Sequence, residues 1–334
     1  MDFINATANL TNKNYQTVNL SYHNFIFLTV NLLLAPFIIG GNFVVIRCIA
    51  TFPRLHTVSN IFVSSLAVAD LFVGLLVIPF YSMHYLELEG FAESKYTCLF
   101  KYVFIIASCG SSIFNLSAIA FERFVAVTFP FRYVTLITHK TAKVIIALLW
   151  IYVSVLSLTP LFGLNTWRPD VHCDFYQVLP RAYIVWASFT TVSFGIISIT
   201  LFYILTYREI RKMPPPPMIQ SKEAISQKKN IRATYVMCVV SVTFLVFWLP
   251  YLIAGPLVYI PSLDKHSIEL IKNYALSLGI SNSVINPFLY GCLRRDFAEV
   301  FRKYFSLPCL KRKRRSVGPG SNGPTENSFP LSEN

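Results

Sequence analysis

Long apolar stretches separated by short polar joints dominate the chain. Seven of them are long enough to cross the roughly 30 Å hydrocarbon core of a membrane as a helix, which needs about 20 residues. They cover residues 24–50, 57–84, 97–127, 142–163, 182–207, 233–260 and 267–291. Only a short break around Pro261, Asp264 and Lys265 separates the last two. The pattern predicts an all-α membrane protein, a bundle of seven transmembrane helices over residues 24–291.

Polar segments precede and follow this bundle. Residues 1–23 lack a secretory signal pattern and carry three Asn-x-Ser/Thr acceptors, at Asn5, Asn9 and Asn19. The acceptors predict a glycosylated, extracellular N-terminal tail, with a chance cluster as the alternative. Residues 292–305 place apolar and charged side chains on opposite faces, which predicts an amphipathic helix on the inner leaflet. Residues 306–334 are rich in Gly, Ser, Pro and Asn, and we expect a disordered cytoplasmic tail.

Composition and charge agree with a multi-pass protein of the plasma membrane. The chain is 54% hydrophobic and only 13% charged, whereas soluble domains carry about 25% charged residues. With the N-terminus outside, about three-quarters of the 29 Lys and Arg residues fall on the cytoplasmic side, as the positive-inside rule requires. The net charge of +13 thus follows from topology and from attraction of the basic residues to anionic lipid of the inner leaflet. We expect no nucleic-acid binding.

The cysteines fit the same topology. Cys98, at the start of the third span, and Cys173, in the joint between the fourth and fifth, both fall on the oxidising outer side and form the predicted disulfide pair. Cys109 lies within a span and is expected to be a small apolar side chain. Cys309 precedes the basic run 311–315 and is a palmitoylation candidate, with an unmodified thiol as the alternative.

Several spans carry polar residues that lipid does not tolerate. Asp70 lies in the second span, where a carboxylate near mid-membrane costs about 2.5–3.5 kcal/mol and needs a cation, a proton or several donors. Asn42 in the first span must hydrogen-bond to a neighbouring helix. The seventh span contains the polar residues Ser281, Asn282, Ser283 and Asn286. We expect all of these to face the bundle interior.

A charged pair and a proline predict a switch. Glu122 and Arg123 close the third span at the depth where it meets the cytoplasm, and charges at that depth are usually functional. Pro250 removes a backbone hydrogen bond from the sixth span and provides a hinge, with Trp248 just below it. We expect Arg123 to be the moving contact of a signalling switch.

Together these motifs resemble the rhodopsin-like (class A) G-protein-coupled receptors over about residues 24–305. The signatures are Gly-Asn at 41–42, Leu-Ala-x-x-Asp at 66–70, Cys98, Glu-Arg-Phe at 122–124, Trp150, Phe-x-x-x-Trp-x-Pro at 244–250 and Asn-Pro-x-x-Tyr at 286–290. The resemblance implies a receptor that converts binding of an extracellular, small-molecule ligand into activation of a heterotrimeric G protein through outward movement of the sixth helix. It also implies arrestin and a receptor kinase as partners, and no enzyme activity.

The resemblance assigns roles to individual residues. The sodium site of such receptors corresponds to Asp70, Ser112, Asn282, Ser283 and Asn286, with Asn42 in the same polar network. Sodium would act there as an allosteric modulator, and no other cofactor is implied. The G-protein-coupling residues correspond to Glu122, Arg123, Phe131, Tyr203 and Tyr290. The switch and hinge residues correspond to Ile113, Phe244, Trp248, Pro250 and Pro287.

Three departures from the family pattern matter. Phe124 replaces the usual tyrosine after the Glu122–Arg123 pair, which leaves the charges in place. Gly195 replaces a proline in the fifth helix, so we expect the local bulge to be lost. Asn230 replaces an acid at the inner end of the sixth helix, so its clamp on Arg123 is missing. We therefore expect appreciable agonist-free signalling.

The ligand is less well specified than the scaffold. Ile105 stands where amine receptors have an aspartate, and Ile280 where opsins have the retinal lysine. Residues 158–163 and 173–175 are most similar to adenosine receptors, but Gly255 and Gly279 stand where those receptors have polar ligand contacts. The pocket candidates are Lys101, Ile105, Cys109, Phe175, Trp248 and Ile280. Lys101 either meets an anionic or lipid ligand or snorkels to the surface, and the sequence favours snorkelling.

Other functional classes find less support. A membrane enzyme would need a nucleophile–base pair or a metal-ligand motif such as His-Glu-x-x-His, and the spans contain none. A transporter would show inverted repeats or broken helices in matching halves, and we find neither. The remaining alternative is a receptor of the same class with a lipid or peptide ligand, or with constitutive activity and no ligand.

Overall fold

The computed structural model describes the backbone of residues 2–86, 94–170, 173–213 and 222–305. Side chains at 2–21, 187–188, 222–226, 265 and 303–305 lie outside this description. In the described residues every regular element is a helix. The all-α prediction is confirmed.

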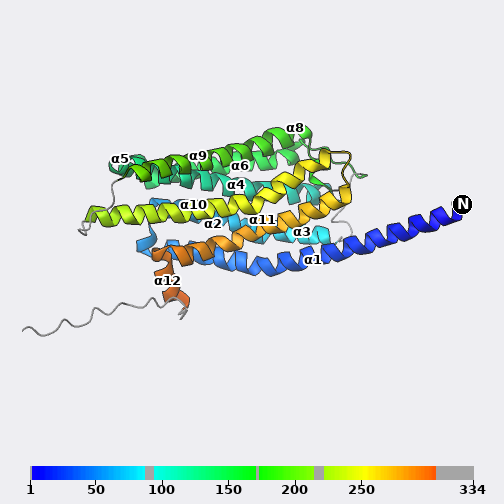
Figure 1. Cartoon of the computed structure of the whole chain (residues 1–334), viewed down its shortest axis with the longest axis horizontal. Helices are drawn as coiled ribbons and strands as arrows, with labels where there is room; N and C mark the ends of the chain where they lie inside the picture. Colours follow the sequence, from blue (N-terminus) through cyan, green and yellow to red (C-terminus); the bar gives the residue numbers. More distant parts are fainter. Residues whose placement is uncertain (1, 87–93, 171–172, 214–221, 306–334) are drawn as a thin grey trace, which may run out of the picture.

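Long helices run along one common direction and form an elongated bundle (Figure 1). They are α1 (Asp2–Thr51), α2 (Val58–Phe72) with η2 (Val73–Val77) and α3 (Ile78–Tyr85), α4 (Lys95–Thr128), α6 (His139–Leu158) with η3 (Thr159–Phe162), α8 (Arg181–Tyr183) with η4 (Ile184–Phe189) and α9 (Thr190–Lys212), α10 (Lys222–Ala254) with η5 (Gly255–Tyr259), and α11 (Lys265–Leu293). The shorter elements are η1 (Pro53–Leu55), α5 (Pro130–Leu136), α7 (Phe175–Val178) and α12 (Arg295–Phe305). Each of the seven predicted spans corresponds to one of these helical rods.

Side-chain caps define where several helices begin. The Thr57 hydroxyl accepts the backbone N–H of Asn60 at the start of α2. Thr138 begins α6 in the same way. Asp264 caps α11 by accepting the backbone N–H of Ser267 at 3.0 Å, and the hydroxyl and N–H of Ser267 hold the pKa of Asp264 below its ordinary value. These caps satisfy N–H groups that a helix start leaves without intrahelical partners.

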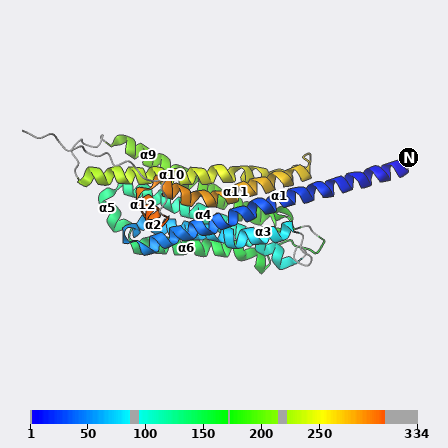
Figure 2. The same ribbon diagram turned by 90° about the horizontal axis from the view of Figure 1, so that it is seen from below.

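Six of the described helices are long and apolar enough to cross a membrane. The seventh rod, α11, is as long as the others, but polar residues interrupt its apolar character between Ser281 and Asn286. It packs against α1 and α10, and α10 and α11 lie side by side in both views (Figures 1 and 2). The neighbouring helices give its polar residues an interior to face.

Two π-helical turns interrupt the rods. In the second rod, η2 lies just before α3, and Pro79 lies in the first turn of α3. In the fifth rod, η4 lies between α8 and α9. The expected loss of a bulge in the fifth helix is therefore wrong, because the bulge is present and lies ahead of Gly195. At Gly195 itself a Cβ would lie 2.6 Å from Ile113 Cγ1, so the glycine permits close packing of α9 on α4.

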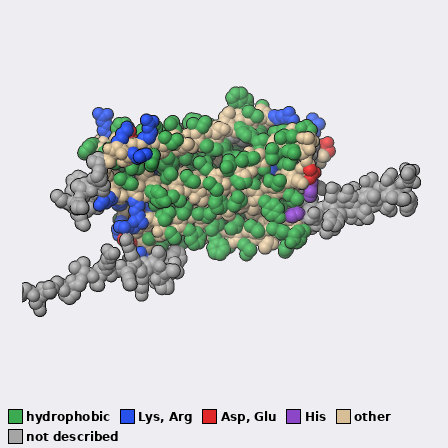
Figure 3. All heavy atoms as spheres, in the orientation of Figure 1, with side chains coloured by type: hydrophobic (Ala, Val, Ile, Leu, Met, Phe, Trp, Pro, Cys, Tyr) green, Lys and Arg blue, Asp and Glu red, His purple; other side chains and the backbone are tan. Residues whose placement is uncertain are grey.

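The outer surface of the bundle is apolar along its length. Hydrophobic side chains cover the visible side, while many Lys and Arg side chains gather at the end that carries α5 and α12 (Figure 3). At that end α12 turns away from α11 (Figure 1). Phe297 of α12 is fully buried and its ring centroid lies 5.8 Å from that of Tyr290. The helix is thus attached to the bundle by its apolar face.

The predicted tails fall largely outside the described part. Asn5, Asn9 and Asn19 belong to the backbone of α1, but their side chains are not described. Residues 306–334, with Cys309, lie outside the described residues altogether. Glycosylation, palmitoylation and the disordered tail therefore stay predictions.

Candidate functional site

Asp70 is the centre of a buried polar network in the middle of the bundle. Its carboxylate is 1% exposed. Oδ1 accepts a hydrogen bond from the Ser283 hydroxyl at 2.7 Å, and Oδ2 accepts one from the Asn286 amide at 2.8 Å. These bonds join α2 to α11 across more than half of the sequence. Asp70 faces the interior, as its sequence context predicts.

The first helix joins the same network through Asn42. The fully buried Asn42 amide donates to the carbonyl of Ile38 at 2.9 Å and to the carbonyl of Ser283 at 3.0 Å. A Cβ at Gly41 would lie 3.0 Å from Pro287 Cγ. The glycine therefore lets α1 pack closely against Pro287 of α11, and this close packing brings Asn42 within reach of the Ser283 carbonyl.

Asp70 and the polar residues of α4 and α11 offer oxygen atoms of the kind that ligate a hard cation. The amide oxygens Oδ1 of Asn282, Asn286 and Asn115 are buried and have no hydrogen-bond partner in the described residues. Ser112 is also buried, on α4, and no hydrogen bond joins it directly to Asp70 in the part of the chain that is described. A carboxylate, hydroxyls and amide oxygens are the ligands that hard cations prefer. Buried oxygens without partners are costly, and Asn286, which is bonded to Asp70, has one in the described residues that an ion here would satisfy.

A second polar cluster, around Glu122 and Arg123, lies near the C-terminal end of α4. Arg123 is 5% exposed, and its Nε donates to Glu122 at 2.6 Å. Arg123 Nη2 and the Tyr133 hydroxyl of α5 both donate to the other carboxylate oxygen of Glu122. Burial and the neighbouring Glu122 raise the pKa of Tyr133. The Arg123 guanidinium is thus held by the preceding residue of α4, Glu122.

The N-terminal part of α10, the sixth rod, makes a contact that the sequence did not predict. No hydrogen bond or ion pair joins Asn230 to Arg123 within the described segments. Instead, Arg232 donates from Nε and Nη2 to the carbonyl of Leu293, at 3.3 and 3.1 Å. This contact joins α10 to the end of α11. Its acceptor is a backbone carbonyl, so no residue type marks it in the sequence.

The remaining predicted coupling residues lie on three further helices, Tyr203 on α9, Tyr290 on α11 and Phe131 on α5. The Tyr203 hydroxyl accepts a hydrogen bond from Ser241 at 3.3 Å. Tyr290 is 1% exposed and its hydroxyl has no partner in the described residues. Phe131, in contrast, is 96% exposed on α5. The two tyrosines lie inside the bundle, and Phe131 projects from its surface.

The predicted hinge residues lie within the helices expected to bend. Pro250 is inside α10 and Pro287 inside α11. The buried Trp248 ring lies 6.1 Å from that of Phe244. A Cβ at Gly279 would lie 3.0 Å from the Trp248 indole. The glycine therefore provides the space into which Trp248 packs against α11.

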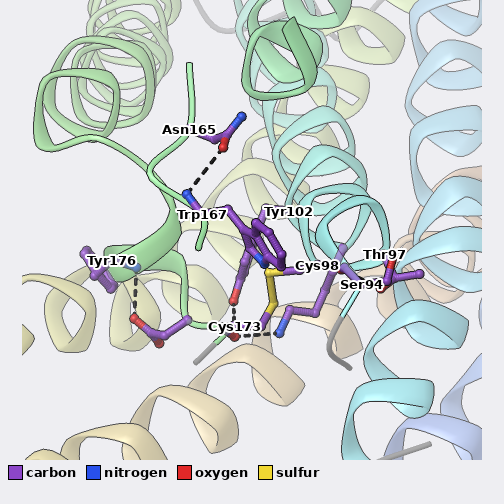
Figure 4. The surroundings of a disulfide bond; sticks show 10 residues. Ser94, Thr97, Cys98, Tyr102, Asn165, Trp167, Cys173 and Tyr176 are labelled. Atoms are coloured by element: carbon purple, nitrogen blue, oxygen red, sulfur yellow. Dashed lines mark hydrogen bonds between the residues drawn. A yellow bond between two sulfur atoms is a disulfide. The ribbon is translucent and has the colours of Figure 1, made fainter. Parts of the chain in front are cut away.

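A disulfide closes the opposite end of the bundle (Figure 4). Cys98 and Cys173 are joined with their Cα atoms 5.8 Å apart, which confirms the predicted pair. The carbonyl of Cys173 accepts hydrogen bonds from the Tyr102 hydroxyl at 2.9 Å and from Lys101 Nζ at 3.2 Å. The bridge and these bonds fix the segment after Cys173 above α4.

Next to the disulfide lies a cavity of about 140 Å³. Of the pocket candidates, Lys101 and Phe175 line it, whereas Ile105, Cys109, Trp248 and Ile280 do not. Lys101 is 4% exposed. The favoured interpretation of Lys101 as a snorkelling side chain is therefore wrong, because its ammonium is held inside by the Cys173 carbonyl.

Glycine also allows an aromatic side chain to fill the space beside α10. A Cβ at Gly255 would overlap the Tyr176 hydroxyl and lie 3.0 Å from Tyr176 Cζ. Burial and the neighbouring Asp174 raise the pKa of this tyrosine. Tyr176 thus occupies the volume that a side chain at position 255 would take.

Comparison with known proteins extends over the whole bundle. The family model described as "7 transmembrane receptor (rhodopsin family)" matches residues 41–290. The chain is 30% identical to adenosine receptor A2a of Canis lupus familiaris over 311 residues, which cover 87% of this chain and 74% of that receptor. It is 30% identical to adenosine receptor A2b of Homo sapiens over 328 residues, 91% of this chain and 97% of that receptor. Over 339 residues it is 29% identical to adenosine receptor A2b of Rattus norvegicus, 94% of this chain and 100% of that receptor.

Proposed function

The chain belongs to the rhodopsin family of seven-transmembrane receptors and is related to the adenosine receptors, and from that membership we propose that it converts binding of a small extracellular ligand into activation of a heterotrimeric G protein. It is a multi-pass G-protein-coupled receptor of the plasma membrane, and its relatives are receptors rather than enzymes. The Arg123 cluster at one end and the cavity at the other supply the two sites that such a function needs.

The proposed activation step is an outward movement of the inner half of α10. Pro250 provides the hinge, because it removes one backbone hydrogen bond from the helix. The movement breaks the contact of Arg232 with the Leu293 carbonyl and opens the space next to Arg123. The G protein then contacts Arg123 inside the bundle and the exposed Phe131 beside it. Arrestin and a receptor kinase are proposed to use the same opened end.

We propose that the N-terminus and the cavity face the outside of the cell. The disulfide supports this orientation, because disulfides persist on the oxidising side of the membrane. Cys98 and Arg123 are near opposite ends of α4, so the coupling cluster falls on the cytoplasmic side. Replacing Asn5, Asn9 and Asn19 by Gln should abolish the mass shift that an N-glycosidase produces on the expressed protein. A glycosidase-insensitive wild-type chain on the cell surface would count against the glycosylated tail.

Sodium is the proposed allosteric ion of the Asp70 network. Asp70, Asn282, Ser283 and Asn286 would hold it, with Ser112 on the facing helix. A bound cation would supply the positive charge that the buried carboxylate lacks. By holding α2 and α11 together, the ion would favour the resting arrangement.

Adenosine, which names the relatives, is not the ligand that this chain's residues favour. Gly255 and Gly279 have no polar side chain to offer a purine or a ribose, and Tyr176 and Trp248 fill the space beside them. Agonist-free signalling is part of the proposal, because Asn230 cannot form an ion pair with Arg123.

The buried Arg123 is the observation that carries this function. Arg123 is 5% exposed, and in the described residues its guanidinium hydrogen-bonds only to Glu122 of the same helix, so the buried charge is costly without a task. Arg123→Ala should abolish G-protein activation in a reporter cell while surface expression stays normal. Arg168→Ala, the same change in the joint on the opposite side, is the matched control and should signal like wild type. Unchanged signalling by Arg123→Ala would refute the proposed coupling role.

A further inference from the structure

The cavity beside the disulfide contains charges that the protein does not neutralise completely. Four acidic or basic side chains other than His84 line it: Lys101, Asp174, Glu269 and Lys272. Two of them pair with each other, since Lys272 Nζ lies 2.7 Å from Asp174 Oδ2. Lys101 and Glu269 are left over, and in the described residues neither has an ion-pair partner. The cavity therefore presents one unneutralised cation and one unneutralised anion.

Lys101 retains capacity to bind an anion. Its ammonium has three donors, and the only hydrogen bond found for it in the described segments goes to the Cys173 carbonyl at 3.2 Å. Its other close contacts are the ring faces of Tyr102 and Tyr81, with Nζ 4.7 and 5.3 Å from the centroids. A buried charge that is served by a single carbonyl and two π faces gains strongly from a carboxylate.

Glu269 selects against ligands with only one kind of charge. A simple anion placed at Lys101 would share the cavity with the Glu269 carboxylate, and a simple amine placed at Glu269 would share it with Lys101. Like charges in a partly desolvated site repel strongly. A ligand that carries both charges meets an opposite charge at each end instead.

The size and walls of the cavity limit the ligand further. Its volume of about 140 Å³ is below the roughly 300–1,000 Å³ typical of sites for drug-sized molecules. Aromatic side chains, among them Tyr81, Tyr102, Phe175 and Tyr251, form much of the lining. Tyr176, which does not line the cavity, fills the volume at Gly255. The site is thus small, and its lining comes from α1, α3, α4, α10, α11 and residues 173–175.

We propose that this cavity binds a small zwitterion, an α-amino acid or a molecule with the same pair of charges, with its carboxylate on Lys101 and its ammonium on Glu269. This ligand class rests on the receptor function proposed above and specifies the ligand of that receptor. Because Lys101 shares the Cys173 carbonyl with Tyr102, a carboxylate on Lys101 also changes the bonding of the segment that holds Tyr176 against α10. That segment connects the occupied cavity to the helix that moves.

The test is thermal unfolding of the purified full-length receptor in detergent, with each of the standard L-amino acids at millimolar concentration. We expect at least one to raise the unfolding midpoint, while its decarboxylated amine and its N-acetyl derivative do not. Lys101→Met and Glu269→Gln should each weaken the apparent affinity about tenfold or more, as expected for loss of a charge-assisted contact. Lys101→Arg, which keeps the charge, should retain part of the shift and shows that the site tolerates substitution.

Lys95→Met is the matched control, because Lys95 lies on the same helix and does not line the cavity; it should leave the shift unchanged. The proposal is overturned if no amino acid stabilises the receptor, if the amine or the N-acetyl acid alone does so equally well, or if Lys101→Met keeps the full shift. Agonist-free signalling that depends on Arg123 is a separate readout. If it persists while the amino acids fail, the receptor function stands and only the ligand class is wrong.

Discussion

At the scale of single residues, Asp70 shows how a charge can be tolerated far from water. Two donors from α11 each give one hydrogen bond to a carboxylate oxygen, and the amide oxygen of one of them, Asn286, has no partner in the described residues. The hydrogen bonds from Ser283 and Asn286 lower the free-energy cost of burying the Asp70 carboxylate, but they bring no positive charge to balance it. If Asp70 binds sodium as proposed, the stability of the bundle depends on the cation in the solvent.

This link predicts a sodium-dependent stability. For a dissociation constant of about 10 mM, 100 mM Na⁺ would stabilise the resting receptor by about 1.4 kcal/mol, a shift of a few degrees in the unfolding midpoint. Thermal unfolding in NaCl compared with choline chloride at equal ionic strength measures it. Asp70→Asn should remove the difference. A midpoint that ignores Na⁺ in the wild type would exclude the ion from this network.

Gly255 and Tyr176 predict a coupled pair of substitutions. Gly255→Ala places a Cβ on the Tyr176 hydroxyl and should destabilise the receptor by about 1–3 kcal/mol, as overpacking does. Tyr176→Phe removes that oxygen and should restore much of the loss, although Cζ at 3.0 Å from the added Cβ still leaves a close contact. Unfolding midpoints of both single variants and the double variant measure the coupling. Additive effects would mean that Tyr176 does not occupy this space.

The sequence predicted which residues are buried better than it predicted their contacts. Asp70, Asn42 and the Cys98–Cys173 bridge follow from the cost of polarity in lipid and from topology. The inward position of Lys101 does not, because its partner is a backbone carbonyl whose place depends on the path of the segment after Cys173. The filling of the space at Gly255 by Tyr176 depends on the same path.

At the scale of elements, the N-terminal part of α10 is held to the end of α11 by the contact of Arg232 with the Leu293 carbonyl. Asn230 offers no charge to Arg123, and the contact of Arg232 with the Leu293 carbonyl takes the place of an ionic clamp. Because this contact is exposed and its two hydrogen bonds replace bonds to water, it contributes only about 0.5–1.5 kcal/mol. The balance between resting and active arrangements is therefore easily shifted.

Arg232→Ala should raise agonist-free signalling about two- to fivefold, the change that a loss of about 0.5–1 kcal/mol from the resting state gives. A reporter assay corrected for surface expression measures it. Arg208→Ala, on the inner part of α9, is the control and should leave the basal signal unchanged. A lower or equal basal signal in Arg232→Ala would show that the contact does not restrain the helix.

The helices themselves were predictable from length and hydropathy, with ends within a few residues at most spans. Their local irregularities were less so. The π-turn η4 forms although Gly195 replaces the proline of the family pattern, so the bulge does not depend on that proline. Such turns are set by packing of neighbouring helices, which a single sequence position does not reveal.

At the scale of the whole molecule, the bundle separates two chemically different ends by an apolar middle (Figure 3). The cavity and the disulfide lie at one end, and Arg123 lies near the other. The Asp70 network lies between them and joins α1, α2 and α11. A signal that crosses this distance needs an element that spans it and can bend, and α10 with its proline hinge fits that requirement.

The distance between the inner ends of α5 and α10 tests this account most directly. Spin labels on Thr135 and Lys228, with Cys292 and Cys309 replaced by serine, report it in the purified receptor by pulsed dipolar spectroscopy. With nucleotide-free heterotrimeric G protein bound, we predict a longer distance than in the free receptor, and no lengthening in Arg123→Ala. A distribution that G protein leaves unchanged in the wild type, despite demonstrated complex formation, would contradict the movement of the sixth helix.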